Sequence, residues 1–275
     1  ATDGRSGARA GWTDFLVTTL ASAAVLGLLI PSISRGRYEA RKTECQEHLR
    51  QLGTAITQFV NLDSGQLLPQ IAERGPFAFS GMYATQLAGR GLLEDGAIRW
   101  CPESELLGVT NIAASFPRNV ATSPCEPIDS VVDKVIHVKD LREAHESGDV
   151  DRLRWQQRMA GGSYSYTLGV LDEGRYAAPH YESRASFAVL GDSVTSGDEA
   201  SAGVDASRLR WGHPGNGANL LFEDGSVRFL TMSSGQQSPD HPYFNHRGSI
   251  EAGMNVDDAS LAPSWRAPFY WSPQR

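Results

Sequence analysis

"YEARKTECQEHLRQLGTAITQFVN", residues 38–61, has the periodicity of an amphipathic helix. Its apolar side chains recur in steps of four, three, four and three residues, which places them along one helix face. These positions are Cys45, Leu49, Leu52, Ile56 and Phe59. Charged and polar residues occupy the opposite face, so the segment is predicted to pack against a globular domain. Gly53 interrupts it at a cost of about 1 kcal/mol.

An uncharged run of 20 residues, "FLVTTLASAAVLGLLIPSIS" (15–34), precedes this segment, with Asp14 before it and Arg35 after it. Twenty helical residues span about 30 Å, roughly the hydrocarbon thickness of a bilayer. A cleavable secretion signal would have a shorter apolar core, and a buried core helix would need more apolar surroundings. The run therefore predicts a single membrane anchor over 15–34.

The domain boundaries follow from this anchor and from the breakers after it. We expect an N-terminal arm over 1–13, one long helix over 14–61, and an exported α+β globular domain over 62–275 with a loop-like C-terminal tail. Gly65 and Pro69 end the helix. A second helix is predicted over 148–160, with Asp149 as its N-cap. Strands are predicted over 163–171 and 186–192.

A β-hairpin is predicted within "HPGNGANLLFEDGSVRFL", residues 213–230. The Asp224-Gly225 pair tolerates the positive φ angles of a tight turn, and apolar runs flank it on both sides. His213 is expected to brace the Gly-Asn loop by hydrogen bonding to the hairpin backbone. The alternative is an oxygen-rich cation site that uses Asp192, Asp224 and loop carbonyls. The brace is favoured because no spaced run of carboxylates surrounds His213.

The three cysteines lack the spacing of a zinc site. Cys101 and Cys125 lie in loop-like, proline-containing contexts, so they are the predicted disulfide pair. Cys45 lies on the apolar helix stripe and is predicted to be a buried thiol. A disulfide would indicate an oxidising compartment.

Composition and motifs argue against several functions. The net charge of −7 gives no domain-wide basic surface, so nucleic acid is not an expected partner. No catalytic or phosphate-binding motif occurs in the sequence. Four polar residues of the C-terminal region lie close together in sequence and could bind a metal, but their spacing fits no regular element. We therefore expect them to be solvated. They are Asp240, His241, His246 and Glu251. No catalytic residue, cofactor or metal is predicted.

Aromatic residues gather near the C-terminus. They are Trp265, Phe269, Tyr270 and Trp271. Such residues either close over the sheet of their own domain or dock on a partner, because Trp and Tyr are enriched at interfaces. Both interpretations stay open from the sequence.

The order of these features resembles a bacterial family. The features, in chain order, are the anchor, the helix with "CQEHLRQLGTAI", then "WCPES", "GGSYSYTLG", "VLGDSV" and a histidine followed after a spacer by "DGSVRF". Type IV pilin-like and pseudopilin-like proteins with a prepilin-type N-terminal methylation segment and a C-terminal His-to-Asp-Gly motif have this order.

The resemblance implies a pilin-like fold, in which a long N-terminal helix has a lipid-embedded first half and packs on an antiparallel sheet. It also implies that Asp14 takes the place of an assembly glutamate, which pairs with the N-terminal amine of a neighbouring subunit. The sequence departs from the family in having Asp there, and in lacking the usual Gly-Phe pair near Arg9-Ala10. Lys and Arg flanking the anchor would keep the domain in the cytoplasm, whereas the resemblance implies a cytoplasmic N-terminus and an extracytoplasmic domain.

Together these features predict a non-enzymatic, membrane-anchored structural or accessory subunit of a filament, a secretion pseudopilus or a larger complex. Its expected partners are membrane lipid and other protein subunits. One alternative is a membrane-tethered receptor that binds a solute or polysaccharide through the loops around His213. Another is a tethered enzyme, which two perturbed titratable groups in a cleft would favour.

Overall fold

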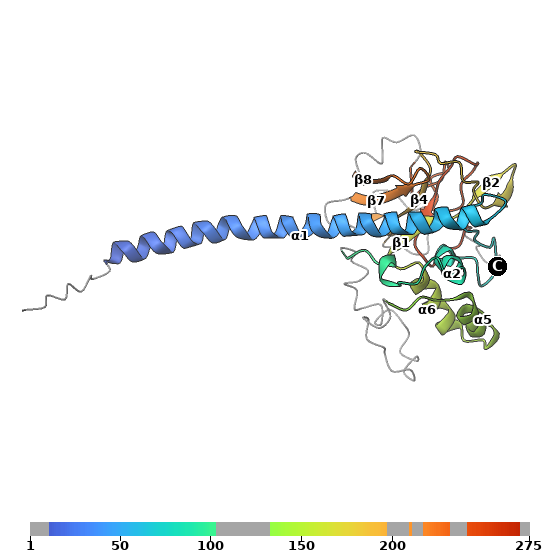
Figure 1. Ribbon diagram of the computed structural model, residues 1–275, viewed down its shortest axis with the longest axis horizontal. Coiled ribbons are helices and arrows are strands. Elements are labelled where there is room, and N and C mark those ends of the chain that lie inside the picture. Colours follow the sequence, from blue (N-terminus) through green and yellow to red (C-terminus); the bar gives the residue numbers. More distant parts are fainter. Residues whose placement is uncertain (1–10, 103–132, 197–208, 211–216, 232–240, 270–275) are drawn as a thin grey trace, which may run out of the picture. The chain divides into compact units, whose positions relative to one another are not determined.

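The computed structural model describes residues 11–102, 133–196, 209–210, 217–231 and 241–269 of the chain (Figure 1). Within the first helix, the side chains of several residues between 13 and 31 are outside this description. The chain divides into two compact units, Ala1–Arg41 and Lys42–Arg275. The first contains only the beginning of a helix among its described residues, and the second is the globular body.

Along the described chain the helices come first and the strands follow. The helices are α1 (Trp12–Leu62), α2 (Met82–Gly89), the 3-10 helix η1 (Ala97–Arg99), α5 (Val138–Glu146) and α6 (Val150–Ala160). The strands are β1 (Tyr164–Thr167), β2 (Val170–Asp172), β3 (Arg175–Ala177), β4 (Ala188–Asp192), β5 (Thr195–Ser196), β6 (Leu209–Arg210), β7 (Gly217–Phe222), β8 (Val227–Thr231) and β9 (Leu261–Ala262).

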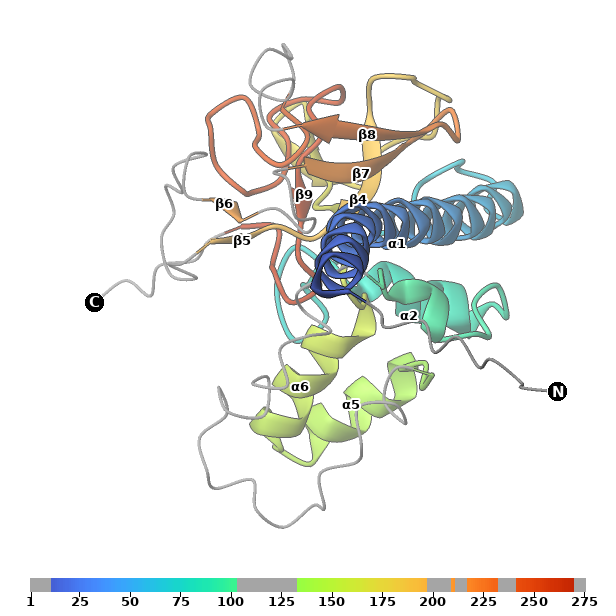
Figure 2. The ribbon, with the colours of Figure 1, turned by 90° about the vertical axis from the view of Figure 1, so that its left-hand side faces the viewer.

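The main sheet has five strands in the order β8-β7-β4-β1-β9, and every neighbouring pair is antiparallel. Two small antiparallel pairs, β2-β3 and β5-β6, complete the described strands. In the globular unit, β4, β7 and β8 lie on one side of the Lys42–Leu62 part of α1, and α2, α5 and α6 lie on the other (Figures 1 and 2).

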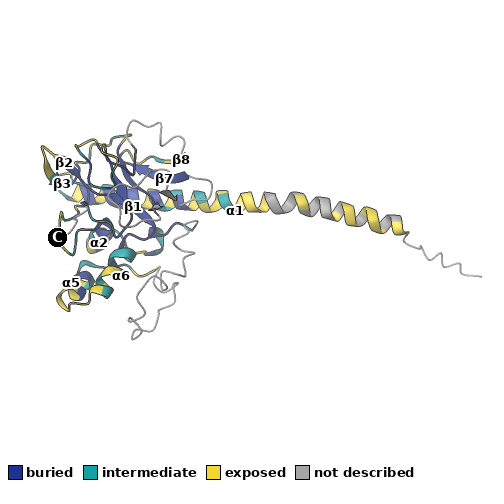
Figure 3. Ribbon diagram, turned by 180° about the vertical axis from the view of Figure 1, so that it is seen from behind, coloured by how far each residue is buried: buried dark blue, intermediate teal, exposed yellow. Residues whose placement is uncertain are grey.

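The apolar stripe of α1 builds the core against this sheet. Leu49 and Leu52 are fully buried, and Ile56 is buried beside them. The core continues through the central strands, where Leu190 and Leu220 are also fully buried (Figure 3). Fully burying one such side chain contributes about 1.5–3 kcal/mol. A second apolar cluster joins α5 and α6 to the start of α2 through Phe79, Met82, Ile136, Leu141 and Ala160.

Close packing explains the glycine in the middle of this buried helix face. A Cβ atom at Gly53 would lie 3.0 Å from both methyl carbons of Leu221 in β7. The absence of a side chain therefore lets α1 approach the sheet closely, which compensates for the poor helix propensity of glycine.

The predicted hairpin is confirmed between β7 and β8. Leu221 pairs with Val227, and Gly225 has a φ of 79° in the turn between them. The Asp224 carboxylate accepts hydrogen bonds from the Ser226 amide at 2.9 Å and from the Ser226 hydroxyl at 2.6 Å. These bonds, the hydroxyl foremost, lower the pKa of Asp224. The predicted N-cap is also confirmed, since Asp149 accepts from the Arg152 amide at 2.9 Å.

The predicted membrane anchor over 15–34 is wrong. Among the residues that the structure describes, no helix is long and apolar enough to cross a membrane. A spanning helix needs about 20 consecutive, predominantly apolar residues, and the described side chains of this part of α1 include the polar Thr19, Ser22 and Ser32, which lower its mean hydropathy. The absence of charged residues from this run was therefore not sufficient to predict a membrane-spanning helix.

The lack of a membrane-spanning helix among the described residues also contradicts the predicted fold class and the predicted location. The α+β, pilin-like fold class with a membrane-spanning first half is corrected to a mixed α/β fold with a five-stranded antiparallel sheet. The location predicted for a single-pass membrane protein is contradicted by the same finding.

The hairpin turn can be tested with two alanine substitutions. Gly225→Ala and Gly89→Ala each add a Cβ with no heavy atom within 4 Å, but only Gly225 has a positive φ. Because the left-handed conformation costs a non-glycine residue roughly 1–2 kcal/mol, Gly225→Ala should lower the free energy of unfolding by about that amount in chemical denaturation. Gly89→Ala serves as the control and should not destabilise the protein. Equal effects would contradict the turn assignment.

Candidate functional site

A buried disulfide joins Cys45 of α1 to Cys101, two residues after η1. This corrects the predicted Cys101–Cys125 pair and the assignment of Cys45 as a thiol. Cys125 is outside the described residues. The bond forms because folding brings the two Cα atoms within 4.8 Å, although 56 residues separate them in sequence. Both cysteines are fully buried, so the apolar setting of Cys45 suits a half-cystine as well as a thiol.

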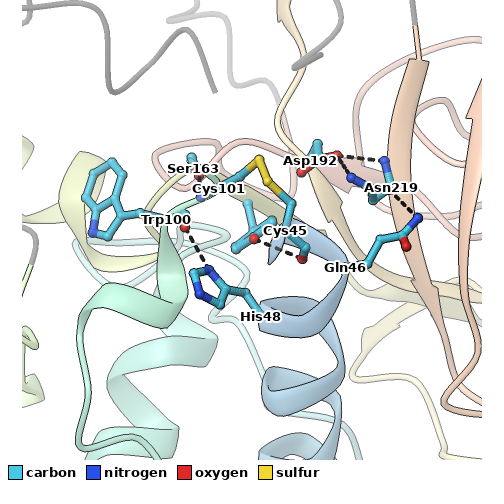
Figure 4. The surroundings of a disulfide bond; sticks show 9 residues. Cys45, Gln46, His48, Trp100, Cys101, Ser163, Asp192 and Asn219 are labelled. Atoms are coloured by element: carbon cyan, nitrogen blue, oxygen red, sulfur yellow. Dashed lines mark hydrogen bonds between the residues drawn. A yellow bond between two sulfur atoms is a disulfide. The ribbon is translucent and has the colours of Figure 1, made fainter. Parts of the chain in front are cut away.

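Hydrogen bonds on both sides fix the disulfide (Figure 4). The amide of Cys101 donates to the Ser163 hydroxyl at 2.7 Å, and the Tyr164 hydroxyl donates to the Cys45 carbonyl at 3.2 Å. One helical turn beyond Cys45, His48 Nδ1 lies 2.9 Å from the Trp100 carbonyl. A carbonyl only accepts, so this nitrogen carries the proton. The segment around Cys101 is thereby held to both α1 and β1.

A buried carboxylate lies beside the two sulfurs. Asp192 ends β4, and its Oδ2 accepts from the Asn219 amide at 2.6 Å and from Asn219 Nδ2 at 2.9 Å. Gln46 of α1 in turn donates from Nε2 to Asn219 Oδ1 at 3.0 Å (Figure 4). A chain of polar contacts therefore crosses from α1 through β7 to β4. We call Cys45, Cys101 and Asp192 the disulfide–Asp192 cluster.

Two tyrosine hydroxyls around this cluster remain proton donors. Burial first, and the Asp192 carboxylate next, raise the pKa values of Tyr164 and Tyr243 well above the ordinary tyrosine value. Tyr243 donates its proton to the Asp192 carbonyl at 2.6 Å. Both groups thus stay neutral at any physiological pH, and their hydrogen bonds are permanent parts of the site.

In the described part of the chain, this cluster is the group of three residues whose side chains could together hold a metal ion. Cys45, Cys101 and Asp192 each offer one ligand atom, and these atoms lie within 4.8 Å of one another. In the disulfide form the sulfurs are bonded to each other and are not thiolate ligands. The two carboxylates of the alternative cation site lie by opposite ends of β7: Asp192 bonds Asn219 near its start, and Asp224 bonds Ser226 in the turn after it.

A buried ion pair anchors the same hairpin at its turn. Glu223 has a fully buried side chain, and its Oε1 lies 2.7 Å from Arg184 Nη2. Its Oε2 accepts from Arg184 Nε at 2.9 Å and from the Arg184 amide at 3.1 Å. Arg184 also bonds Asp257 Oδ1 at 3.0 Å through Nη1. The pair ties the hairpin to the loop before β4 and to the C-terminal region.

A buried arginine holds α6 and η1 together. Arg99 Nη1 donates to the Ala160 carbonyl at 2.7 Å and to the Met159 carbonyl at 2.9 Å, and Nη2 donates to the Lys134 carbonyl at 2.8 Å. Burial lowers the pKa of Arg99 to about 10, so the guanidinium stays charged at neutral pH. It satisfies backbone carbonyls at a helix C-terminus, where a cation is favourable.

Several residues singled out from the sequence lie outside the described structure. They are His213, Cys125, Asp240, Tyr270 and Trp271; for Asp14, only its position in α1 is described. The brace role of His213 and the assembly role of Asp14 therefore stay predictions.

The described aromatic residues of the C-terminal region have partners within the globular unit. Phe269 makes an edge-on contact with Tyr176 at 5.4 Å between ring centroids, and Arg158 stacks over Trp265 at 4.9 Å. His241 packs on Phe244 at 4.8 Å, and burial lowers its pKa. His246 instead faces the buried Asp258 at 3.7 Å. Neither His241, His246 nor Glu251 belongs to a metal-ligand group among the described residues.

The polar contact between Asp192 and Asn219 was not predicted, although the sequence around both residues pointed to buried polar side chains. Asp192 and Asn219 both interrupt apolar strand sequences, "AVLGD" and "GANLLF", at buried positions. Polar side chains inside buried strands need partners, which identifies both as candidates for a pair. The partner itself depends on strand order, which the sequence pattern did not supply.

No family model matches this chain, and neither a curated protein nor a solved structure matches it.

Removal of the disulfide should destabilise the protein strongly. Cross-linking across 56 residues contributes about 4 kcal/mol through the lost entropy of the unfolded chain. The double variant Cys45→Ala/Cys101→Ala should lose about that much in guanidinium unfolding, whereas Cys125→Ala should retain wild-type stability. A Cys101–Cys125 peptide in a non-reducing digest would contradict the assignment.

The buried ion pair can be compared with an exposed one. Glu223→Gln should cost about 2–3 kcal/mol, because it leaves a largely buried guanidinium with one charged partner fewer. The control is Glu143→Gln, which removes a solvent-exposed pair with Arg152 at 3.3 Å and should cost less than about 1 kcal/mol. Urea unfolding of both variants measures the difference, and equal losses would show that Glu223 is not a structural anchor.

Proposed function

We propose that this chain is a non-enzymatic structural subunit, which assembles with other subunits, further copies of itself among them, through the N-terminal part of α1. The globular unit is the body that such an assembly displays. Two observations support this proposal: the exposed apolar surface of α1 and the internal bracing of the globular unit.

The exposed apolar side chains at the start of α1 are the observation that carries the proposal. Trp12 is 80% exposed, Phe15 69% and Leu20 74%. They recur at intervals of three and five residues, together with the exposed Leu16 and Val17. Large contiguous apolar patches on a protein surface are typical of interaction sites. Burying each such side chain against another subunit would contribute about 1.5–3 kcal/mol.

The globular unit has the properties of a passive, stable body. Its buried polar groups hold elements of the fold to one another: Asn219 holds Asp192, Glu223 holds Arg184, and Arg99 bonds carbonyls at the end of α6 and before α5. A covalent bond adds to these contacts at Cys45 and Cys101. The motif order that resembles pilin-like subunits supports the same kind of role. This support comes from the sequence and concerns assembly alone.

Charged substitutions on α1 test the assembly role. Phe15→Glu/Leu20→Glu should shift the full-length protein from oligomer to monomer in sedimentation velocity, because carboxylates cannot be buried cheaply in an apolar interface. Val150→Glu is the matched control, since Val150 is 53% exposed on α6 of the globular unit; it should leave the oligomer intact. A monomeric wild type at all concentrations, or equal dissociation by the control, would refute the proposal.

A further inference from the structure

The disulfide–Asp192 cluster places two sulfurs and a carboxylate close together in the buried interior. Their ligand atoms lie within 4.8 Å of one another, and all three residues are at most 1% exposed. Each comes from a different element: Cys45 from α1, Cys101 from the segment after η1, and Asp192 from the end of β4 (Figure 4). Three separate elements of the fold therefore meet at this cluster.

We propose that, in its dithiol form, the chain binds one thiophilic divalent metal ion such as Zn²⁺ through Cys45, Cys101 and Asp192. Thiolate sulfur and carboxylate oxygen are both zinc ligands, and three protein ligands with a water in the fourth position is a common zinc arrangement. The soft sulfurs select against Mg²⁺ and Ca²⁺, which prefer oxygen ligands. This inference is independent of the proposed assembly role.

The disulfide and the metal site are alternative states of the same two sulfurs. A dithiol reductant supplies two electrons and two protons, the Sγ–Sγ bond breaks, and the reductant becomes a disulfide. Cys45 and Cys101 are then thiols. Zn²⁺ binds their thiolates, and the two protons are released to solvent.

The two cysteine thiols of this site are expected to ionise only when a divalent metal ion is bound. Two buried thiolates beside the Asp192 carboxylate would bring three negative charges together, and burial and like charge both disfavour ionisation of a thiol. A divalent cation reverses this balance, because the ion is the largest local charge and deprotonates its thiol ligands. The reduced cluster is therefore expected to hold neutral thiols without metal and thiolates with it.

Asp192 is already fixed in position for this role. Its Oδ2 is held by two donors of Asn219, and Asn219 is held in turn by Gln46. Such hydrogen bonds around a ligand orient it and raise metal affinity. The carboxylate thus needs little rearrangement when the sulfurs separate.

The test compares the oxidised and reduced full chain. The protein is reduced with dithiothreitol in guanidinium, refolded anaerobically with Zn²⁺, desalted and analysed for metal by mass spectrometry. We expect about one Zn²⁺ per reduced chain and none per oxidised chain. Refolding with Co²⁺ should add sulfur-to-cobalt charge-transfer absorption. A reduced wild type without bound metal would overturn the proposal.

Variants show whether the three residues are the ligands. Asp192→Asn preserves an oxygen that can accept from Asn219 but loses the charge, and it should weaken Zn²⁺ binding about tenfold or more. Cys45→Ser should abolish the charge-transfer band. Cys125→Ser is the control, and it should bind like the wild type. Unchanged binding in Asp192→Asn or Cys45→Ser, or loss of binding in Cys125→Ser, would assign the metal to other groups and refute the site.

Discussion

The covalent bond between Cys45 and Cys101 is the constraint around which the globular unit is arranged. It joins the buried face of α1 to the segment after η1, and η1 itself ends at Arg99, whose guanidinium reaches the C-terminus of α6. On the other side, Tyr164 and Ser163 link the same two cysteines to β1. Helix, sheet and helical layer therefore meet at one cross-link.

The strand β7 and its turn contribute a second set of restraints. Asn219 bonds Asp192 in the middle of the sheet, Glu223 pairs with Arg184 beside the turn, and Asp224 closes the turn itself. One short stretch of chain thus contains three acidic or amide side chains with three different structural partners. Buried polar groups satisfied in this way specify a single arrangement more sharply than apolar packing alone, because each has few acceptable partners.

The two proposals concern different parts of the molecule and different chemistry. The proposed assembly would depend on the apolar side chains of the first unit, where burial by another chain would supply the free energy. Metal binding depends on the redox state of the globular unit, where the same sulfurs either close a disulfide or bind an ion. An oxidising environment favours the cross-linked body, since disulfides persist there.

Local patterns in the sequence determined the elements whose physics is local. The periodicity of α1 predicted which of its side chains are buried, Asp149 was recognisable as a helix cap, and Asp224-Gly225 as a hairpin turn. The disulfide partner of Cys101 was not predictable, because proline-containing contexts say nothing about which cysteines meet. Only the tertiary structure brought Cys45 to Cys101, Asp192 to Asn219 and Glu223 to Arg184, since each pair joins elements far apart in the chain. Helix caps and turns depend on neighbouring residues, whereas these pairs depend on strand order and on how closely α1 packs against the sheet.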